Sequence, residues 1–137
     1  NNIFFIRVDQ SGSIIEGSER FFDGALSANN QSVDANVSAS EDTGNAIIAT
    51  RDGGFVLACT TLTTPNRGNG GKDILLIKID TQGNMVWNKI IGGAGDETVN
   101  SIRETNDGGL LICGSNHVSG LSSMVVIKTN KNGELND

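Results

Sequence analysis

The stretch that decides the fold is residues 73–83, which read Asp-Ile-Leu-Leu-Ile-Lys-Ile-Asp-Thr-Gln-Gly. A nearly continuous apolar run such as 74–79 is typical of a strand that is buried on both faces. The run ends in a tight-turn signal, because an Asp side chain can cap backbone N–H groups two residues on and Gly adopts a positive φ. Another apolar segment, 85–91, follows at once. The stretch therefore predicts an antiparallel hairpin of strands 74–80 and 85–91.

The same pattern recurs along the chain. Residues 5–12, 76–83 and 126–133 align without gaps, and each reads apolar, Ile, basic, apolar or Thr, Asp or Asn, two polar residues, Gly. A second block, 41–54, is identical to 96–109 at seven positions, including the Thr, the Asp and both Gly of Thr-x-Asp-Gly-Gly. Self-similarity at a fixed period is the signature of a repeat architecture.

The spacing of the repeats supports a shared scaffold. Lys78 and Lys128 are 50 residues apart, whereas Arg7 and Lys78 are 71 apart. The 21 extra residues of the first unit fall in two polar stretches, 23–40 and 64–71. Insertions that are confined to loops are expected when two units share one framework.

Each unit predicts four antiparallel strands, so the expected fold class is all-β with no helix. The expected strands are 3–9, 14–22, 45–50, 55–61, 74–80, 85–91, 98–105, 110–115 and 124–130. Four strands repeated every 50 residues are typical of a propeller blade. We expect a segment of a β-propeller with about two blades and the first strand of a third. An open stack and a two-chain assembly are the alternatives.

The expected domain organisation follows the repeat. The first unit is 1–72 with the insertion 23–40, the second is 73–122, and 123–137 starts a third. Both ends lie within the pattern, so we expect the chain to be part of a longer propeller. The insertion is either a binding loop or a solvated addition, because its length alone does not decide. It contains two formal glycosylation acceptors, at Asn30 and Asn36.

Composition and charge exclude several classes of protein. The chain has 18 Gly, 16 Asn and one Pro in 137 residues, which opposes a helical protein because Gly and Asn favour turns. The net charge of −6 argues against nucleic acid as a partner. No apolar run approaches the roughly 20 residues that span a membrane, so we expect no transmembrane segment.

The second unit resembles a known family. The residues that carry the resemblance are 73–80, Gly83-Asn84, Trp87, Lys89, Gly92-Gly93, Asp96-Glu97, Ser101-Ile102, Thr105, Asp107-Gly108-Gly109 and Gly114. They are similar to the tandem repeats of β-propeller-like secreted and outer-membrane lipoproteins of Bacteroidota. The resemblance covers nearly the whole chain except the two insertions, and it implies an extracellular or outer-membrane surface location, with the periplasm less favoured.

The first unit departs from this pattern, and the family motif identifies no catalytic residues. Where the second unit has Trp87, Lys89 and Gly92-Gly93, the first has Gly17, Glu19 and Phe22-Asp23. We therefore assign no catalytic, cofactor-binding or metal-binding residues and expect no cofactor.

The acidic residues have two interpretations. The pairs Glu41-Asp42 and Asp96-Glu97, with Asp80 and Asp107, could supply oxygen ligands for Ca²⁺ at loop ends. No stretch has the Asp-x-Asp-x-Asp-Gly spacing that organises a Ca²⁺ loop, and turn capping explains Asp before Gly. We therefore expect turn caps. A glycosidase acid and base is disfavoured, because a residue that recurs in every unit is more plausibly structural.

Four other features have structural and functional interpretations. Trp87 fills space between sheets, or it is an exposed platform for a sugar. His117, the only histidine, is expected in an exposed loop. Cys59 and Cys113 are expected as two buried thiols on opposite faces, because the repeat aligns Cys113 with Ala58. The glycine-rich stretches 68–71 and 92–95 are expected as turns, because neither has the features of a phosphate loop.

The expected function is that of a non-enzymatic interaction or scaffold module of a cell-surface or outer-membrane protein. Its partner would be a protein, a subunit of a larger outer-membrane assembly, or a glycan, bound through loop faces. One alternative is a propeller enzyme, for example a glycan-acting one, whose site lies in blades outside this chain. The other is a structural spacer. Fold analogy alone supports these classes.

Overall fold

The computed structural model describes residues 2–22, 41–63 and 71–135, and in these ranges the protein is all-β with no helix. The insertion 23–40 and most of the second polar stretch, 64–70, lie outside the described residues. The nine strands are β1 (Ile3–Phe5), β2 (Arg20–Phe22), β3 (Asp42–Ala49), β4 (Phe55–Thr63), β5 (Gly71–Ile79), β6 (Met85–Ile91), β7 (Asp96–Glu104), β8 (Leu110–Val118) and β9 (Leu121–Thr129). The expected all-β class is confirmed. In the described ranges no helix has the length and apolarity needed to cross a bilayer.

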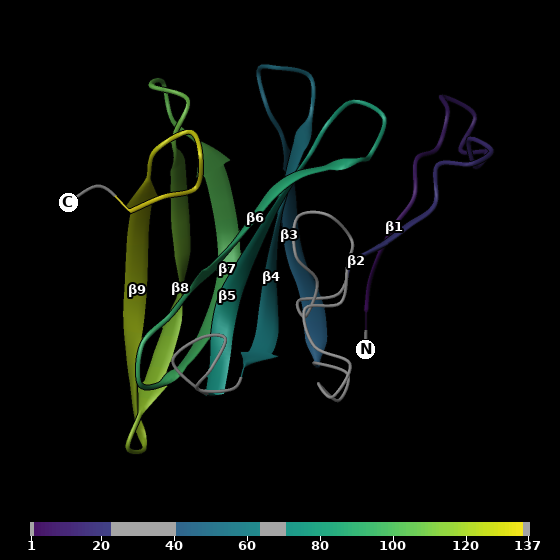
Figure 1. Cartoon of the computed structure of the whole chain (residues 1–137). Helices are drawn as coiled ribbons and strands as arrows, with labels where there is room; N and C mark the ends of the chain where they lie inside the picture. Colours follow the sequence, from purple (N-terminus) through teal and green to yellow (C-terminus); the bar gives the residue numbers. More distant parts are fainter. Residues whose placement is uncertain (1, 23–40, 64–70, 136–137) are drawn as a thin grey trace.

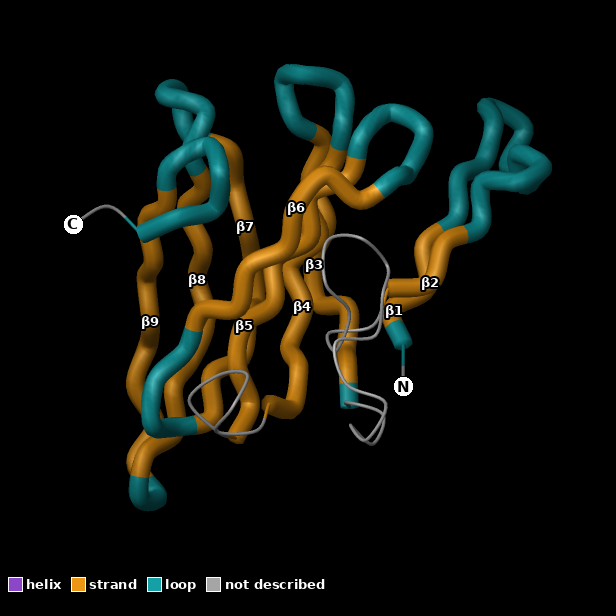
Figure 2. Tube along the Cα trace, viewed as in Figure 1, coloured by secondary structure: helices purple, strands orange, loops and turns teal. Residues whose placement is uncertain are grey.

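The strands form three antiparallel sheets in chain order: β1-β2, β3-β4-β5-β6 and β7-β8-β9. Figures 1 and 2 show the three sheets side by side, with the four-stranded sheet between the other two. We call them the first, central and third sheets. They do not close on one another, so the ring of a propeller is not present in the described residues.

The boundaries of the sheets do not coincide with the boundaries of the sequence units. The central sheet runs from Asp42 to Ile91, so the boundary between the first two sequence units, at 72/73, falls inside β5. The second unit therefore contributes its opening hairpin, β5-β6, to a sheet that the first unit began. The pairing of β4 with β5 extends from Phe55↔Ile79 to Thr63↔Gly71. This ladder interlocks the two units.

Strand β5 is buried on both faces, as its apolar run predicts. Leu75, Ile77 and Ile79 pack toward the first sheet, in one cluster with Ile3 and Phe5. The alternate residues Ile74 and Leu76 belong to a second cluster, which includes the following residues of the third sheet: Val99, Ile102, Leu110 and Ile112. Burial of apolar surface on both sides of the central sheet holds the three sheets together.

Two β-bulges occur at the same repeat position. The pairing of β3 with β4 shifts register between Gly44 and Ala46, and that of β7 with β8 shifts between Val99 and Ser101. The residues between them, Asn45 and Asn100, are among the seven identities of the repeat. The recurring Asn therefore marks a bulge, which increases the local twist of each sheet.

The first pair of strands is shorter than the sequence predicts. Strands were expected over 3–9 and 14–22, but beyond β1 and β2 only the bridge Val8↔Ile14 continues the pairing. The Ser18 hydroxyl accepts a bond from Arg7 N at 3.1 Å and donates one to Arg7 O at 3.2 Å, and Arg7 O also accepts the backbone N–H of Ile15 at 2.9 Å. Gly17, with a φ of +71°, bends the chain just before it. The interruption separates the hairpin tip from the sheet.

Candidate functional site

The repeated turns gather at one end of the stacked sheets, which we call the turn end (Figure 1). One type of turn follows the basic strand residue and begins at Asp9, Asp80 or Asn130. The Asp80 Oδ1 atom accepts hydrogen bonds from Gln82 N at 2.9 Å and Asn84 N at 2.8 Å. The bonds from the Asn84 and Gln82 groups hold the pKa of Asp80 below its ordinary value. The prediction that Asp80 caps a turn is confirmed.

The Thr-x-Asp-Gly-Gly block forms the second type of turn. In the central sheet, the Thr50 hydroxyl donates to Asp52 Oδ1 at 2.6 Å, and Gly54 N donates to the same oxygen at 3.1 Å. Lys78 reaches this turn from β5, and its Nζ lies 2.7 Å from Asp52 Oδ1 and 2.5 Å from Thr50 Oγ1. The bonds from Lys78 and then Thr50 lower the pKa of Asp52 to about 2.

The third sheet repeats this Thr–Asp–Lys cluster. Thr105 and Gly109 N both donate to Asp107 Oδ1, and Lys128 Nζ lies 2.9 Å from Asp107 Oδ2. The bonds from Thr105 and Lys128 lower the pKa of Asp107. The two lysines differ in exposure: the side chain of Lys78 is 9% exposed and that of Lys128 is 37% exposed.

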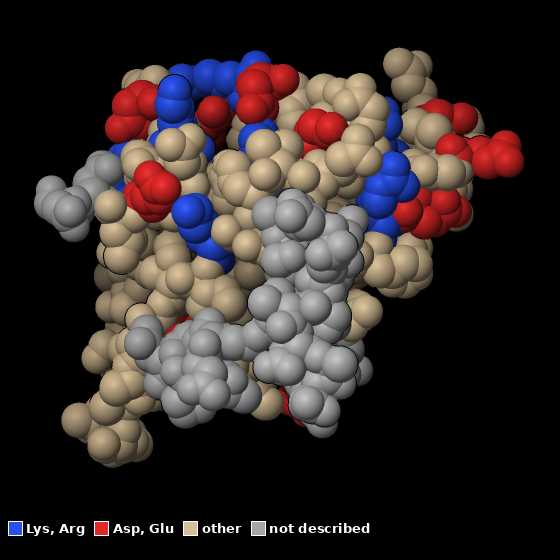
Figure 3. Space-filling model, viewed as in Figure 1, with Lys and Arg blue, Asp and Glu red and all other residues tan. Residues whose placement is uncertain are grey.

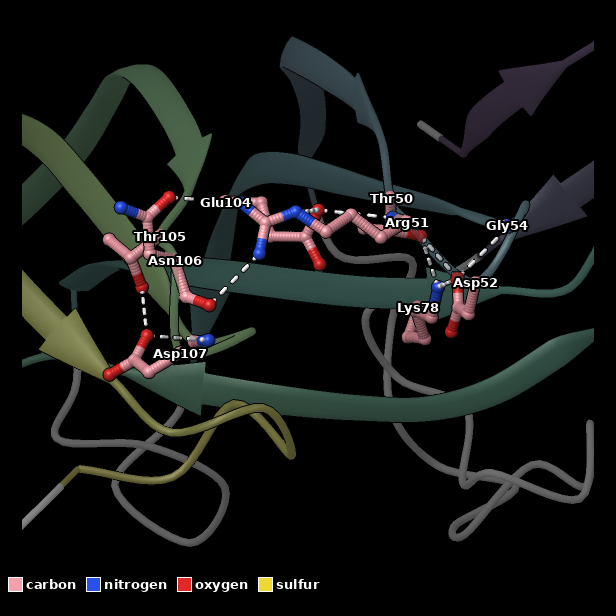
Figure 4. Close-up of polar contacts among 10 residues, drawn as sticks. Thr50, Arg51, Asp52, Gly54, Lys78, Glu104, Thr105, Asn106 and Asp107 are labelled. Atoms are coloured by element: carbon pink, nitrogen blue, oxygen red, sulfur yellow. Dashed lines mark hydrogen bonds and ion pairs between the residues drawn. The ribbon is translucent and has the colours of Figure 1, made fainter.

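Arg51 joins the central and third sheets at the turn end (Figure 4). Its backbone N–H donates to Glu104 Oε2 at 3.0 Å. Its guanidinium donates to the Asn106 carbonyl at 2.9 Å and to the Asn106 side-chain oxygen at 3.1 Å. Lys89 and Glu134 add a second link between these sheets, with Nζ and Oε1 3.4 Å apart.

A groove of about 540 Å³ lies between the central and third sheets at this end. Val56, Trp87 and Leu110 supply apolar lining, and the charged groups around them have both signs. Those charged residues are Arg51, Asp52, Lys78, Glu104, Asp107 and Lys131. Figure 3 shows basic and acidic side chains mixed along the upper edge of the molecule, where the turns lie.

Trp87 packs between the sheets, as the structural interpretation predicts. The half-buried indole contacts the apolar cluster of the central and third sheets. Gly133, in a turn of the third sheet, backs onto the ring, where a β-carbon would lie 2.7 Å from Trp87 Cη2. Trp87 also lines the groove, and its role as a platform for a sugar stays a prediction.

The other predicted acidic residues lie at the far end of the strands. Asp42 is a buried strand residue whose Oδ1 accepts the Thr61 hydroxyl at 2.6 Å, so it is not the turn cap we expected. Glu97 is also buried, and its Oε2 accepts Gly93 N at 2.8 Å across the 92–95 turn. Asp96 accepts Lys72 N at 2.9 Å and links β7 to β5. In the described part of the chain, no three His, Cys, Asp or Glu residues come together as a metal site.

The cysteines and the histidine are only partly where the sequence places them. Both cysteines are free, and Cys59 is buried while Cys113 is half-buried, so the prediction of two buried thiols was wrong for Cys113. His117 is exposed as expected, but it lies in β8, paired with Asp96, instead of in a loop. The Lys–Thr–Asp clusters and the Arg51 link were not predicted.

No protein-family model matches the chain, and no curated protein shows significant sequence similarity to it. The site must therefore be interpreted from its own chemistry. Five of its charged groups are paired with one another or with backbone groups: Arg51, Asp52, Lys78, Glu104 and Asp107. This arrangement is suited to binding through paired charges and an aromatic side chain.

The Lys78–Asp52 pair predicts a specific dependence of stability on pH. Asp52 titrates near its ordinary value of 3.8 in the unfolded chain and at about 2 in the folded protein. Its contribution is therefore complete above about pH 4 and is lost as the pH falls toward about 2. Because the Asp52 side chain is 65% exposed, solvent screening limits that contribution to about 1 kcal/mol or less.

Urea unfolding between pH 2 and 7 would measure this contribution. In Lys78→Met, we expect a lower free energy of unfolding at pH 7 and a shallower loss between pH 4 and 2. Lys72→Met is the matched control, because Lys72 lies on the same strand at the opposite end and is exposed. Parallel pH profiles for the two variants would contradict the assigned role of Lys78.

Proposed function

We propose that this chain is a non-enzymatic interaction and scaffold module of a cell-surface or outer-membrane protein, folded as a segment of a β-propeller. It binds a protein or a glycan through the loops of its turn end. The observation that carries the proposal is the groove between the central and third sheets, with Trp87 in its lining and charges of both signs around it.

The chemistry of the groove supports binding. Ligand sites combine apolar lining with a few polar groups that are held in place, and loops on a rigid framework are where such sites usually lie. Here Arg51 and the Lys89–Glu134 pair join the two walls. An aromatic side chain beside hydrogen-bonding groups suits a sugar ring or a peptide side chain.

The stacking of the sheets supports the propeller assignment. Three antiparallel sheets follow one another in chain order, and each has apolar side chains on both of its faces. The central sheet buries apolar side chains on both faces, and each outer sheet buries them on one face and exposes them on the other. Such sheets need neighbours on both sides, which a propeller provides. The resemblance to repeats of Bacteroidota lipoproteins supports the proposed surface location, and protease treatment of intact source cells would test it.

The fluorescence of Trp87 provides the experiment, because it is the only tryptophan and it lines the groove. Panels of soluble oligosaccharides and of peptides are titrated into the protein, and the emission of Trp87 is followed. We expect a ligand that enters the groove to change the emission saturably. Lys131→Glu, at the groove, should weaken that binding, whereas Lys72→Glu, at the opposite end of β5, should not.

Two results would contradict the proposal. One is a ligand, found by an independent binding assay, whose affinity is the same in the wild type and in Lys131→Glu and which leaves Trp87 emission unchanged. The other is turnover of a glycan by the chain, which would favour an enzyme. Retention of folding in the variants, measured by circular dichroism, separates loss of binding from loss of structure.

A further inference from the structure

The outermost sheets each expose one apolar face. On the third sheet, this face contains Leu111, Cys113, Met124 and Val126, and we call it the tail face. On the first sheet, Phe4 and Phe21 form an exposed pair, and Val8 and Ile14 are exposed on the hairpin beyond it. We call these four residues the head face. Met124 is 78% exposed, Val126 56% and Phe21 65%. Adjacent exposed apolar side chains on a sheet face are a signature of an interaction surface.

The repeat identifies what covers a tail face. Met124 and Val126 align with Ile74 and Leu76 of the central sheet, which are fully buried. Leu111 and Cys113 align in the same way with two other buried residues, Val56 and Ala58. All four equivalents belong to the cluster that the third sheet covers. The covering element is thus a sheet of the same repeat.

The same comparison identifies what covers a head face. Phe4 and Val8 align with Leu75 and Ile79, which are buried in the cluster that contains residues of the first sheet. Phe21 pairs with Phe4 across the hairpin, and their ring centroids are 4.9 Å apart. Ile14 pairs with Val8. We call a face head-type or tail-type when its residues align with those of the head face or of the tail face. Between the first and central sheets, the head-type face of the central sheet packs on the tail-type face of the first sheet.

Both interfaces between the described sheets therefore join a head-type face to a tail-type face, and within 2–22, 41–63 and 71–135 one face of each type is left exposed. We propose that a second copy of this chain docks with its head face on the tail face of the first. The two faces differ, so the contact is heterologous, and repeated addition produces an open stack or a ring. This surface is distinct from the turn-end groove and goes beyond the proposed function.

Sedimentation velocity of the protein over a range of concentrations tests the proposal. We expect the weight-average sedimentation coefficient of the wild type to rise with concentration. Val126→Asp blocks the tail face and Phe21→Asp the head face, so each variant alone should lose this rise. Mixed together, they retain one intact head and one intact tail, and they should form a heterodimer that grows no further.

Cys113 gives an independent readout from within the tail face. Cys59 is buried, and burial raises its pKa to about 12, so a thiol reagent labels Cys113 selectively in the folded protein. The labelling rate of Cys113 should fall as the wild-type concentration rises. In Phe21→Asp, whose head face is blocked, the rate should stay constant.

Several outcomes would overturn the proposal. A wild type that stays monomeric at all soluble concentrations would exclude docking of a second copy. That result is expected if a further repeat of the same polypeptide covers each face. Self-association that persists in either single variant, or a mixture that fails to pair, would exclude the head-to-tail contact. Met124→Asp replaces Val126→Asp if the latter is misfolded by circular dichroism. Trp87-reported binding is measured separately in the groove, so either proposal can fail alone.

Discussion

Leu76→Ala is expected to lower the free energy of unfolding by about 3 kcal/mol, whereas Val126→Ala changes it by less than about 0.5 kcal/mol. The two residues occupy the same position of the repeat. Leu76 is fully buried between the central and third sheets, so truncation there leaves a cavity. Val126 is 56% exposed on the tail face, where water fills the space that truncation leaves.

Urea unfolding at low protein concentration measures both effects without a contribution from association. The comparison of Leu76→Ala with Val126→Ala is a stringent test of the sheet order, because the difference between their costs depends only on which sheet face is covered by a neighbouring sheet. If Val126→Ala cost as much as Leu76→Ala at low concentration, the tail face would be covered by part of the same chain. If both substitutions were harmless, the central sheet would not lie between the other two.

Much of the fold is predictable from the apolar pattern. The run at 74–79 and the hairpin signal after it predict β5, its burial and its pairing with β6, and the structure confirms all three. The assignment of strands to sheets is less accessible. A hairpin signal shows that two strands pair, but it does not show which sheet they join. Strand β5 pairs with β4, which belongs to the preceding sequence unit, and the repeat alone does not assign strands across that boundary.

The turn-end clusters were only partly accessible from sequence. Thr50 and Asp52 recur as Thr105 and Asp107, and a basic residue recurs in the second strand after each turn. This recurrence is the one signal that could have indicated a cluster. The loop between the turn and the lysine differs in length between the units, so spacing alone does not predict the contact. The Arg51 link had no such signal, because Asn106 stands at the equivalent position of the second unit.

Gly54→Ala is expected to destabilise the protein by about 3 kcal/mol, through crowding and not through backbone strain. A β-carbon at Gly54 would lie 2.3 Å from the carbonyl oxygen of Ile79 and 2.7 Å from Lys78 Nζ. The carbonyl belongs to the neighbouring strand and has no freedom to move aside. The substitution would therefore separate β4 from β5 where their ladder begins and displace Lys78 from Asp52.

Gly12→Ala is the control, since Gly12 has a φ of +84° and open space around its α-carbon. It should cost only the strain of a left-handed conformation, about 1 kcal/mol. Gly109 repeats the environment of Gly54, with a β-carbon position 2.2 Å from the Thr129 carbonyl oxygen, so Gly109→Ala should also be severe. Equal costs for Gly54→Ala and Gly12→Ala in urea unfolding would contradict this explanation. The two glycines of each Asp-Gly-Gly turn are then required for different reasons. The first, Gly53 or Gly108, adopts the positive φ of the turn, and the second, Gly54 or Gly109, allows the adjacent strand to approach closely.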